Sequence, residues 1–214
     1  MLVDNLWRCM SNPKKTRSEQ KREDILNAAM TAFREQGVKS TSMDKLAELA
    51  GVSKRTVYNH FATKEDLVLS LLAEMWQQFM LRSDLRYDPN ITPRVQLREL
   101  IEAEVNMLCD DDFIALARVA MGHFFYHPDA MRRELDKMNA QETVLERWLK
   151  AAKADGKLNA DDVQYAADQL RSLLKGALFW PRVMCDDVCP KLPERNKLVD
   201  ETLMMFSCRY LSAE

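Results

Sequence analysis

Apolar residues recur at helical spacing along almost the whole chain, and this periodicity constrains the fold more than any other feature. Leu26, Ala29, Met30 and Phe33 illustrate it, since they fall on one face of a helix that starts near residue 22. Only five Gly and seven Pro occur in 214 residues, fewer than sheets with tight turns usually need. The sequence therefore predicts an all-α protein with about nine helices and no sheet.

Two short helices separated by a glycine turn follow the first predicted helix. Ser42 can cap a helix over residues 43–50, Gly51 ends it, and Ser53 can cap a second helix that runs to residue 61. This layout is a helix-turn-helix unit, in which the second helix enters the major groove of DNA.

The second of these short helices exposes a set of hydrogen-bond donors and no acid. Its inward positions are Val57 and Phe61, at i and i+4. The positions left for solvent are Lys54, Arg55, Thr56, Tyr58, Asn59 and His60. Phosphates and base edges require such donors, so the pattern indicates a DNA-reading helix, whereas the alternative is an ordinary solvated polar face.

The remaining chain predicts a long fourth helix, a linker and five more helices. The fourth helix opens with a capping box at Thr63 and Asp66, and residues 84–93 form the linker. The later helices are expected at residues 93–109, 112–126, 128–154, 160–186 and 193–211. We therefore divide the chain into a basic arm (1–19), a helix-turn-helix domain (20–66) and a helical body (67–214).

Charge is unevenly distributed between these parts. Residues 1–66 carry 12 Lys and Arg against 9 Asp and Glu, whereas residues 67–214 carry 19 against 24. A basic head on an acidic body suits a polyanion bound at one end, although chance clustering explains the asymmetry equally well. The basic run from Lys14 to Arg22 is expected to precede the first helix, either as a DNA-tracking arm or as a solvated tail. Either Met1 or Met10 can be the start.

The segment STSMDKLAELAGVSKRTVYNHFATKEDL, residues 40–67, resembles the DNA-binding head of the TetR (tetracycline-repressor-like) family. The resemblance covers about residues 20–75, including the preceding helix and its terminal Gly37. It implies phosphate contacts from Ser42, Thr56, Tyr58, His60 and Lys64, and base contacts from Lys54 and Arg55. Two positions depart from the family pattern: Arg55 replaces a small residue, and Asp44 places an acid where a structural role is more plausible than a DNA contact.

The resemblance also implies a homodimer that reads a pseudo-palindromic operator and senses a small, largely apolar effector. Dimerisation would use the last two long helices, with Leu170, Leu174, Leu178, Leu203 and Phe206 as candidates. The effector would lie among the middle helices, against Met107, Met121, Phe124, Phe125 and Trp148. Both sets have a plainer interpretation as the core of a single chain.

Other function classes fit the sequence less well. There is no glycine-rich phosphate loop, nucleophile elbow or HExxH motif, so we expect no enzyme and no cofactor. His123 and His127 lie at i, i+4 without a third metal ligand at a telling spacing, and the Cys185/Cys189 pair shows no sign of activation. Without a signal peptide or an apolar span, the chain is expected in the cytoplasm, away from membranes. The main alternatives are a helical scaffold and a regulator that responds to a protein partner.

Overall fold

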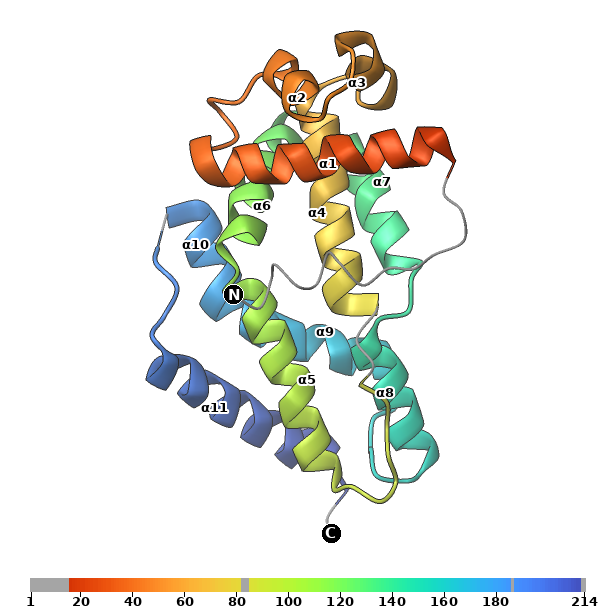
Figure 1. Ribbon diagram of the computed structural model, residues 1–214. Coiled ribbons are helices and arrows are strands. Elements are labelled where there is room, and N and C mark those ends of the chain that lie inside the picture. Colours follow the sequence, from red (N-terminus) through yellow and green to blue (C-terminus); the bar gives the residue numbers. More distant parts are fainter. Residues whose placement is uncertain (1–15, 82–84, 186, 213–214) are drawn as a thin grey trace. The chain divides into compact units, whose positions relative to one another are not determined.

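The computed structural model describes residues 16–81, 85–185 and 187–212 (Figure 1). Within these ranges every regular element is a helix, and the single bridge between extended residues joins Leu158 to Leu211. The all-α prediction is therefore confirmed. The chain separates into two compact units, residues 1–67 and 68–214. Residues 1–15, which include most of the predicted arm and both candidate starts, lie outside the described part.

The first unit contains α1 (Arg17–Gln36), α2 (Met43–Leu49), α3 (Lys54–His60) and the first turn of α4 (Lys64–Leu81). The start of α1 differs from the prediction, because the helix begins at Arg17 and not near residue 22. Thr16 accepts from the backbone N–H of Glu19, and Glu19 accepts from that of Thr16, so a capping box nucleates the helix there. The basic residues from Arg17 onward are thus helical and do not form an extended arm.

Glycine and capping side chains set the turn between α2 and α3. Gly51 has φ 64°, and its N–H donates to Glu48 O while the N–H of Val52 donates to Ala47 O. This pair of bonds is a Schellman motif, which satisfies the last carbonyls of α2. On the other side of the turn, the Ser53 side chain accepts from the N–H of Thr56 and caps α3. The predicted caps are therefore present.

A small apolar core joins the helices of the first unit. Ile25 and Leu26 of α1, Leu46 of α2 and Val57 of α3 are each no more than 1% exposed. Phe61, which follows α3, is 2% exposed and lies under the guanidinium of Arg22, 5.0 Å from the ring centroid. Burial of such side chains contributes roughly 1.5–3 kcal/mol each. The inward face of α3 is thus anchored, and its remaining surface is left for solvent.

The second unit contains, after the end of α4, the helices α5 (Pro93–Leu108), α6 (Asp111–Tyr126), α7 (Pro128–Asn139), α8 (Val144–Ala154), α9 (Val163–Leu174), α10 (Trp180–Cys185) and α11 (Leu192–Tyr210). A π-helical turn, Lys175–Phe179, joins α9 to α10. If α9, the π-helical turn and α10 are counted as one continuous helix, the described part of the chain has ten helices. One more is found than predicted, because residues 128–154 form two helices.

The break between α7 and α8 has a local cause. Thr143 caps α8 by accepting from the N–H of Glu146, and the Glu146 carboxylate accepts from the N–H of Thr143. This capping box starts a new helix, so α7 cannot continue into α8. At its other end, α8 stops at Gly156, which has φ 71° and closes a second Schellman motif.

The π-helical turn lies in the middle of the predicted helix 160–186. Around it, buried residues recur at every fourth position, and they are Ala166, Leu170, Leu174, Leu178 and Arg182. Arg182 is 4% exposed, and its guanidinium donates to Leu108 O at 2.7 Å and to Asp111. The turn therefore keeps one face of the helix against the body.

A buried ionic cluster connects α5, α8 and α9. The guanidinium of Arg171 lies 3.0 Å from Glu146 Oε1 and 3.6 Å from Glu104 Oε1, and it also donates to the Thr143 hydroxyl. Glu104 and Glu146 are each 7% exposed, and Glu104 Oε1 has no hydrogen-bond partner in the described structure. Burial raises the pKa of Glu104, whereas for Glu146 hydrogen bonds from Thr143 and Arg171 outweigh burial and lower the pKa. One arginine thus holds two carboxylates in the interior.

Candidate nucleic-acid interface

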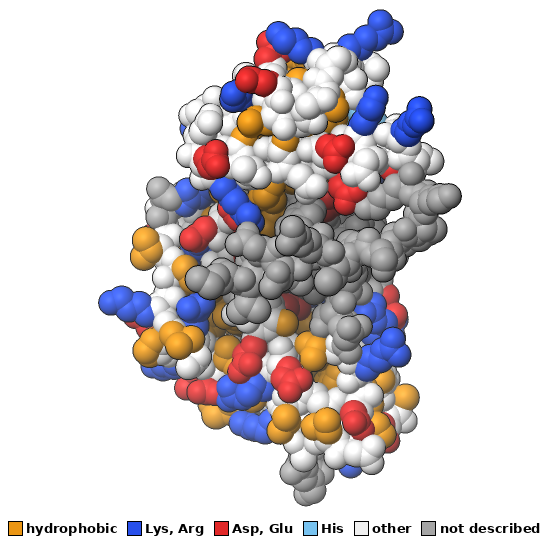
Figure 2. Space-filling model, in the orientation of Figure 1, with side chains coloured by type: hydrophobic (Ala, Val, Ile, Leu, Met, Phe, Trp, Pro, Cys, Tyr) orange, Lys and Arg blue, Asp and Glu red, His pale blue; other side chains and the backbone are white. Residues whose placement is uncertain are grey.

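The exposed face of α3 carries most of the residues predicted to contact DNA. Lys54, Arg55 and Asn59 are exposed, and Tyr58 is 50% exposed, whereas Val57 on the opposite face is fully buried. Figure 2 shows Lys and Arg side chains projecting from this part of the molecule. The seven residues of α3 make two turns, which is enough to present one face to a groove.

Arg55 and Asn59 are the α3 side chains whose polar groups are most available. Neither has a hydrogen-bond or ion-pair partner among the residues that the structure describes. They lie four positions apart, so they project from the same side of the helix. Arginine can donate two hydrogen bonds to guanine, and asparagine can donate one to N7 of adenine and accept one from its N6 amino group, so this face is chemically suited to base recognition.

Lys54 is engaged within the protein. Its ammonium lies 2.5 Å from Asp44 Oδ2 in α2, in an exposed ion pair. The hydrogen bond to Asp44, together with the charge of that carboxylate, raises the pKa of Lys54. Asp44 therefore has the structural role expected of it, but through a partner that the sequence did not indicate. A DNA phosphate or base would have to compete with this carboxylate for Lys54.

The hydroxyl groups predicted to contact phosphates belong to the helix caps. The Ser42 hydroxyl accepts from the N–H of Lys45 at 3.2 Å, which caps α2. The Thr56 hydroxyl lies 2.8 Å from that of Ser53, the cap of α3. Each hydroxyl has one proton and two lone pairs, so capping leaves capacity for a further bond. Ser53 was not predicted as a site residue, although its position before α3 places it beside Thr56.

Lys64 has a different role from the predicted phosphate contact. Its ammonium donates to Val38 O at 2.9 Å, to Thr41 O at 3.2 Å and to Lys39 O at 3.3 Å. An ammonium has three donors, and all three are used by the loop that connects α1 to α2. The structure therefore makes Lys64 a residue that positions this loop, and direct phosphate binding would break these bonds.

His60 ends α3 and lies half-buried beside Phe61, with ring centroids 6.3 Å apart. Phe61 is held in turn by Arg22 of α1, so the placement of His60 depends on a residue that sequence reasoning had assigned to the arm.

The predicted effector residues differ widely in burial. Met107 and Trp148 are each 2% exposed, and the Trp148 indole donates to Gln96 at 3.2 Å, so both belong to the core. Phe124 is 9% exposed and Met121 is half-buried. Phe125 is 64% exposed, which contradicts its placement in a pocket, because it lies on the outer side of α6.

The predicted dimer residues are buried within a single chain. Leu170, Leu174, Leu178, Leu203 and Phe206 are each no more than 3% exposed. They cannot form an interface without unpacking the body, so the prediction is wrong in its choice of residues. The exposed apolar side chains on the same helices are Tyr165, Leu173, Trp180, Met184, Leu192, Met204 and Met205. Helical periodicity had marked the inward face, whereas the apolar residues available to a partner lie on the outward face.

The histidine and cysteine pairs form no metal site. The rings of His123 and His127 lie 4.5 Å apart between centroids, but no cluster of three or more His, Cys, Asp or Glu suited to a metal occurs in the described ranges. Cys189 forms a side-chain hydrogen bond with Cys109. Burial, with a contribution from Cys189, raises the pKa of the Cys109 thiol to about 12, so this thiol is unreactive at neutral pH. No helix in residues 16–81, 85–185 or 187–212 is long and apolar enough to cross a membrane.

Comparison with known proteins agrees with this arrangement. Residues 25–71 match the family "Bacterial regulatory proteins, tetR family". Residues 95–212 match the family "AefR-like transcriptional repressor, C-terminal domain". Together these matches cover the helix-turn-helix unit and most of the helical body.

Individual relatives show the same likeness. A TetR family transcriptional regulator from Pseudomonas syringae pv. tomato str. DC3000 is 36% identical, with a TM-score of 0.71 over 91% of this chain and 99% of that one. The flavonoid-responsive regulator FrrA is 25% identical, with a TM-score of 0.60 over 91% and 99%. The fatty acid metabolism regulator protein of Bacillus subtilis (strain 168) is 31% identical over 43% of this chain and 47% of its own length. The chain thus matches less than half the length of this curated relative. The matches to the family over both of its parts show that the chain belongs to the TetR family of transcriptional regulators and is not an enzyme.

Proposed function

We propose that this regulator is a repressor that binds a pseudo-palindromic operator as a homodimer and is released by a small, largely apolar effector. The exposed donor face of α3, with Arg55 and Asn59 available and no acidic residue on the helix, carries the DNA-binding part of the proposal. The match of residues 95–212 to a family described as repressors supports the sign of regulation.

Within this proposal the α3 side chains have separate tasks. Arg55 and Asn59 read base edges, and Lys54 joins them once it leaves Asp44. Ser42, Thr56, Tyr58 and His60 donate to phosphates and hold the helix in register. Lys64 contributes indirectly, because its bonds to the loop before α2 fix the position of Ser42.

Selection of bound sequences from random DNA, followed by titration of the selected site, tests the DNA-binding part. Arg55→Ala is expected to relax preference at one position per half-site and to cost about 1–3 kcal/mol on the selected operator. Lys197→Ala removes an exposed cation of α11 and is the matched control, with affinity unchanged. If no sequence is enriched, or if Arg55→Ala and Lys197→Ala bind the selected site alike, the assignment of α3 as the reading helix is wrong.

The outward apolar face of the helical segment Val163–Cys185, which comprises α9, the π-helical turn and α10, and of α11 supports the homodimer. Leu173, Trp180, Met204 and Met205 are each between 38% and 53% exposed, although they are large apolar side chains. Their helices also expose Gly176 and Ala177, whose small size permits close helix packing. Two heads related by a two-fold axis require two half-sites, so a dimer predicts a pseudo-palindrome.

The effector part of the proposal is supported by composition and by a relative. Helix α6 is rich in Met and aromatic residues, and a structural relative at 25% identity is named for its response to flavonoids. In the proposed mechanism, the effector favours a body conformation that spaces the two heads wrongly for successive major grooves. A coupling of about 1–3 kcal/mol would lower operator affinity about 5–150-fold.

A screen of apolar and amphipathic compounds against operator binding and thermal stability tests this response. Phe124→Ala is expected to alter the response to a compound found in the screen, while the apo protein binds DNA as before. Linkage requires that operator DNA weaken the compound by the same factor by which the compound weakens DNA. A screen in which no compound changes either measurement would contradict the proposed effector but not the DNA-binding assignment.

A further inference from the structure

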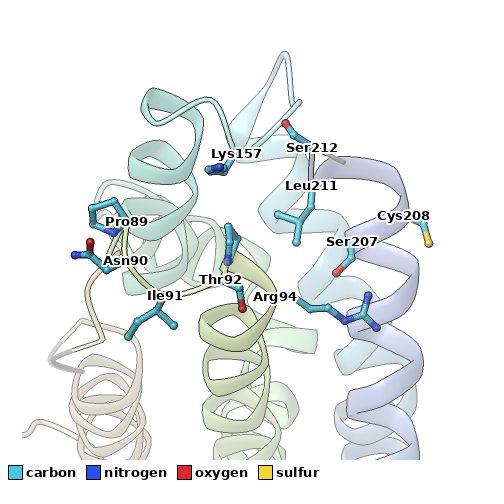
Figure 3. Close-up of a pocket in the computed structure, with 11 residues that line it drawn as sticks. Pro89, Asn90, Ile91, Thr92, Arg94, Lys157, Ser207, Cys208, Leu211 and Ser212 are labelled. Atoms are coloured by element: carbon cyan, nitrogen blue, oxygen red, sulfur yellow. The ribbon is translucent and has the colours of Figure 1, made fainter. Parts of the chain in front are cut away.

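A groove of about 760 Å³ lies in the second unit, between the start of α5, the loop after α8 and the end of α11 (Figure 3). Its size is within the range of pockets that hold small molecules. None of the residues proposed to bind the effector lines it, so it is a separate feature of the body.

Backbone hydrogen bonds hold one wall of the groove in place. The loop after α8 pairs with the end of α11, where Asn159 N donates to Tyr210 O at 2.7 Å and Ser212 N donates to Lys157 O at 3.0 Å. The Ser212 hydroxyl also donates to Gly156 O at 3.0 Å. A wall fixed in this way is preformed, which lowers the entropic cost of binding a ligand.

The charged side chains among the described residues that line the groove are positive. Arg94 and Lys157 line it, and neither has a hydrogen-bond or ion-pair partner for its side chain in the described structure. Among its lining residues that the structure describes, none is Asp or Glu. Arg94 is also the second residue of α5, whose positive helix end opens here, and Thr92 makes no side-chain cap bond to that end. The groove is therefore suited to an anion.

Ser207 provides an independent sign that a polar ligand group is accommodated. It lines the groove from α11, is 8% exposed, and its Oγ has no hydrogen-bond partner in the described structure. Figure 3 shows it on the side of α11 that faces the start of α5 and Arg94. A buried hydroxyl without a partner is unfavourable because it has lost its bonds to water, and a ligand oxygen that accepts from it would remove that penalty.

Apolar side chains complete the lining. Pro89 and Ile91 border the groove from the loop before α5, and Leu211 borders it from the end of α11 (Figure 3). Phosphate or sulfate would leave these side chains exposed to water, whereas an anion with a hydrocarbon part would cover them and gain affinity from the apolar surface that it buries. From these features together we infer that the groove binds a small carboxylate with an apolar chain, its carboxylate between Arg94 and Ser207.

Calorimetric titration of the full chain with octanoate, without DNA, tests the inference. Octanoate is expected to bind with a Kd below about 1 mM. Octanol and octylamine have the same chain without the negative charge and are expected to bind at least about fivefold more weakly. Inorganic phosphate, which has the charge without the chain, is also expected to bind more weakly. Because no operator is present, failure here leaves the proposed DNA-binding function untouched.

Substitutions locate the binding site. Arg94→Gln and Lys157→Gln are each expected to weaken octanoate binding about fivefold or more. Ser207→Ala is expected to weaken it by a smaller factor. Lys197→Gln removes an exposed cation of α11 that does not line the groove, and it should leave the Kd unchanged. Circular dichroism and thermal unfolding confirm that each variant is folded, which is expected because Arg94 and Lys157 are exposed.

Three results would overturn the inference. One is the absence of octanoate binding at concentrations well above 1 mM. Another is equal binding of octanol, which would show that charge is not recognised. The third is binding that Arg94→Gln and Lys157→Gln leave unchanged, which would place octanoate at another site.

Discussion

Replacement of Arg171 by Met is expected to destabilise the body strongly and in a way that depends on pH. Arg171 is the cation of the buried cluster, at 3.0 Å from Glu146 and 3.6 Å from Glu104, with 12% of its side chain exposed. Met fills a similar volume without the charge. Two carboxylates, each 7% exposed, would then remain buried without their arginine.

The size of the stability loss depends on whether each buried carboxylate stays ionised or takes up a proton. A buried carboxylate without a cation can take up a proton, and near pH 7 this costs a group with an ordinary pKa about 3.5 kcal/mol. Near pH 5 the same protonation costs about 1 kcal/mol. Breaking a buried ion pair typically costs about 3–5 kcal/mol. We therefore expect Arg171→Met to lower the free energy of unfolding by that amount at pH 7.5 and by about 1–2 kcal/mol at pH 5.

In the unmodified protein the two carboxylates have opposite pH dependences. The pKa of Glu104 is raised, because burial outweighs the attraction of Arg171 and Lys175 and adds to the repulsion from Glu146, so its contribution is lost as pH rises through that pKa. The pKa of Glu146 is lowered, so its contribution is lost as pH falls through that pKa. Without Arg171 both pKa values should be raised, and stability should then increase toward pH 5.

Urea unfolding followed by circular dichroism, at one protein concentration and at both pH values, measures these differences. Arg98→Met is the matched control, since Arg98 also faces two carboxylates, Glu102 and Asp200, but has 40% of its side chain exposed. It should cost no more than about 1 kcal/mol. Adding Glu104→Gln and Glu146→Gln to Arg171→Met should recover much of the loss at pH 7.5. An Arg171→Met loss below about 1 kcal/mol, or one equal at both pH values, would refute the reasoning.

Three further predictions concern the head and the proposed dimer. Asp44→Asn should raise operator affinity a few-fold in anisotropy titrations, because it frees Lys54 and removes an acid near phosphates; unchanged or weaker binding would contradict this. Lys64→Met should lower the melting temperature and weaken DNA binding equally on all sequences. The salt dependence of binding should stay the same, because the Lys64 ammonium is bonded to backbone carbonyls; a salt slope lower by about one unit would instead indicate a direct phosphate contact. Leu173→Glu should give folded monomers in sedimentation, whereas Leu174→Glu, at a fully buried position, should unfold the body; a dimeric Leu173→Glu variant would exclude this face.

The sequence predicted the head more accurately than the body. In the head, the caps at Ser42, Ser53 and Thr63 are local, and each uses a side chain and a backbone N–H three residues apart, so spacing alone reveals them. Two capping boxes of the same kind, at Thr16 and Thr143, also depend on local spacing. They set the start of α1 and the break before α8, which apolar periodicity alone does not mark.

Contacts between distant residues could not be predicted in this way. Helical periodicity identifies apolar faces, but it does not say whether a face meets its own chain or another, so Leu174 was chosen for the interface where Leu173 is exposed. The hydrogen bonds from Lys64 to the loop before α2 span more than 20 positions of the sequence. Arg171 contacts Glu104, which lies 67 positions earlier. Such pairings depend on the tertiary arrangement of the helices, which no local pattern encodes.

The π-helical turn at Lys175–Phe179 has a consequence for how the helix from Val163 to Cys185 can change. Residues four apart on an α-helix rotate by about 40° relative to each other, so a face repeating every fourth residue would drift halfway around the axis over four repeats. The wider turn cancels part of this drift, and Leu170 and Arg182 remain on one side. The turn thus behaves as a one-residue insertion absorbed without a loop. Deleting Gly176 would restore uniform α-helical geometry and place Leu170, Leu174, Leu178 and Arg182 at i, i+4, i+7 and i+11, which is one α-helical face, so Arg182 would still point toward Leu108 and Asp111. The irregular segment is therefore the part of this helix whose length can change by one residue while its buried face stays in place.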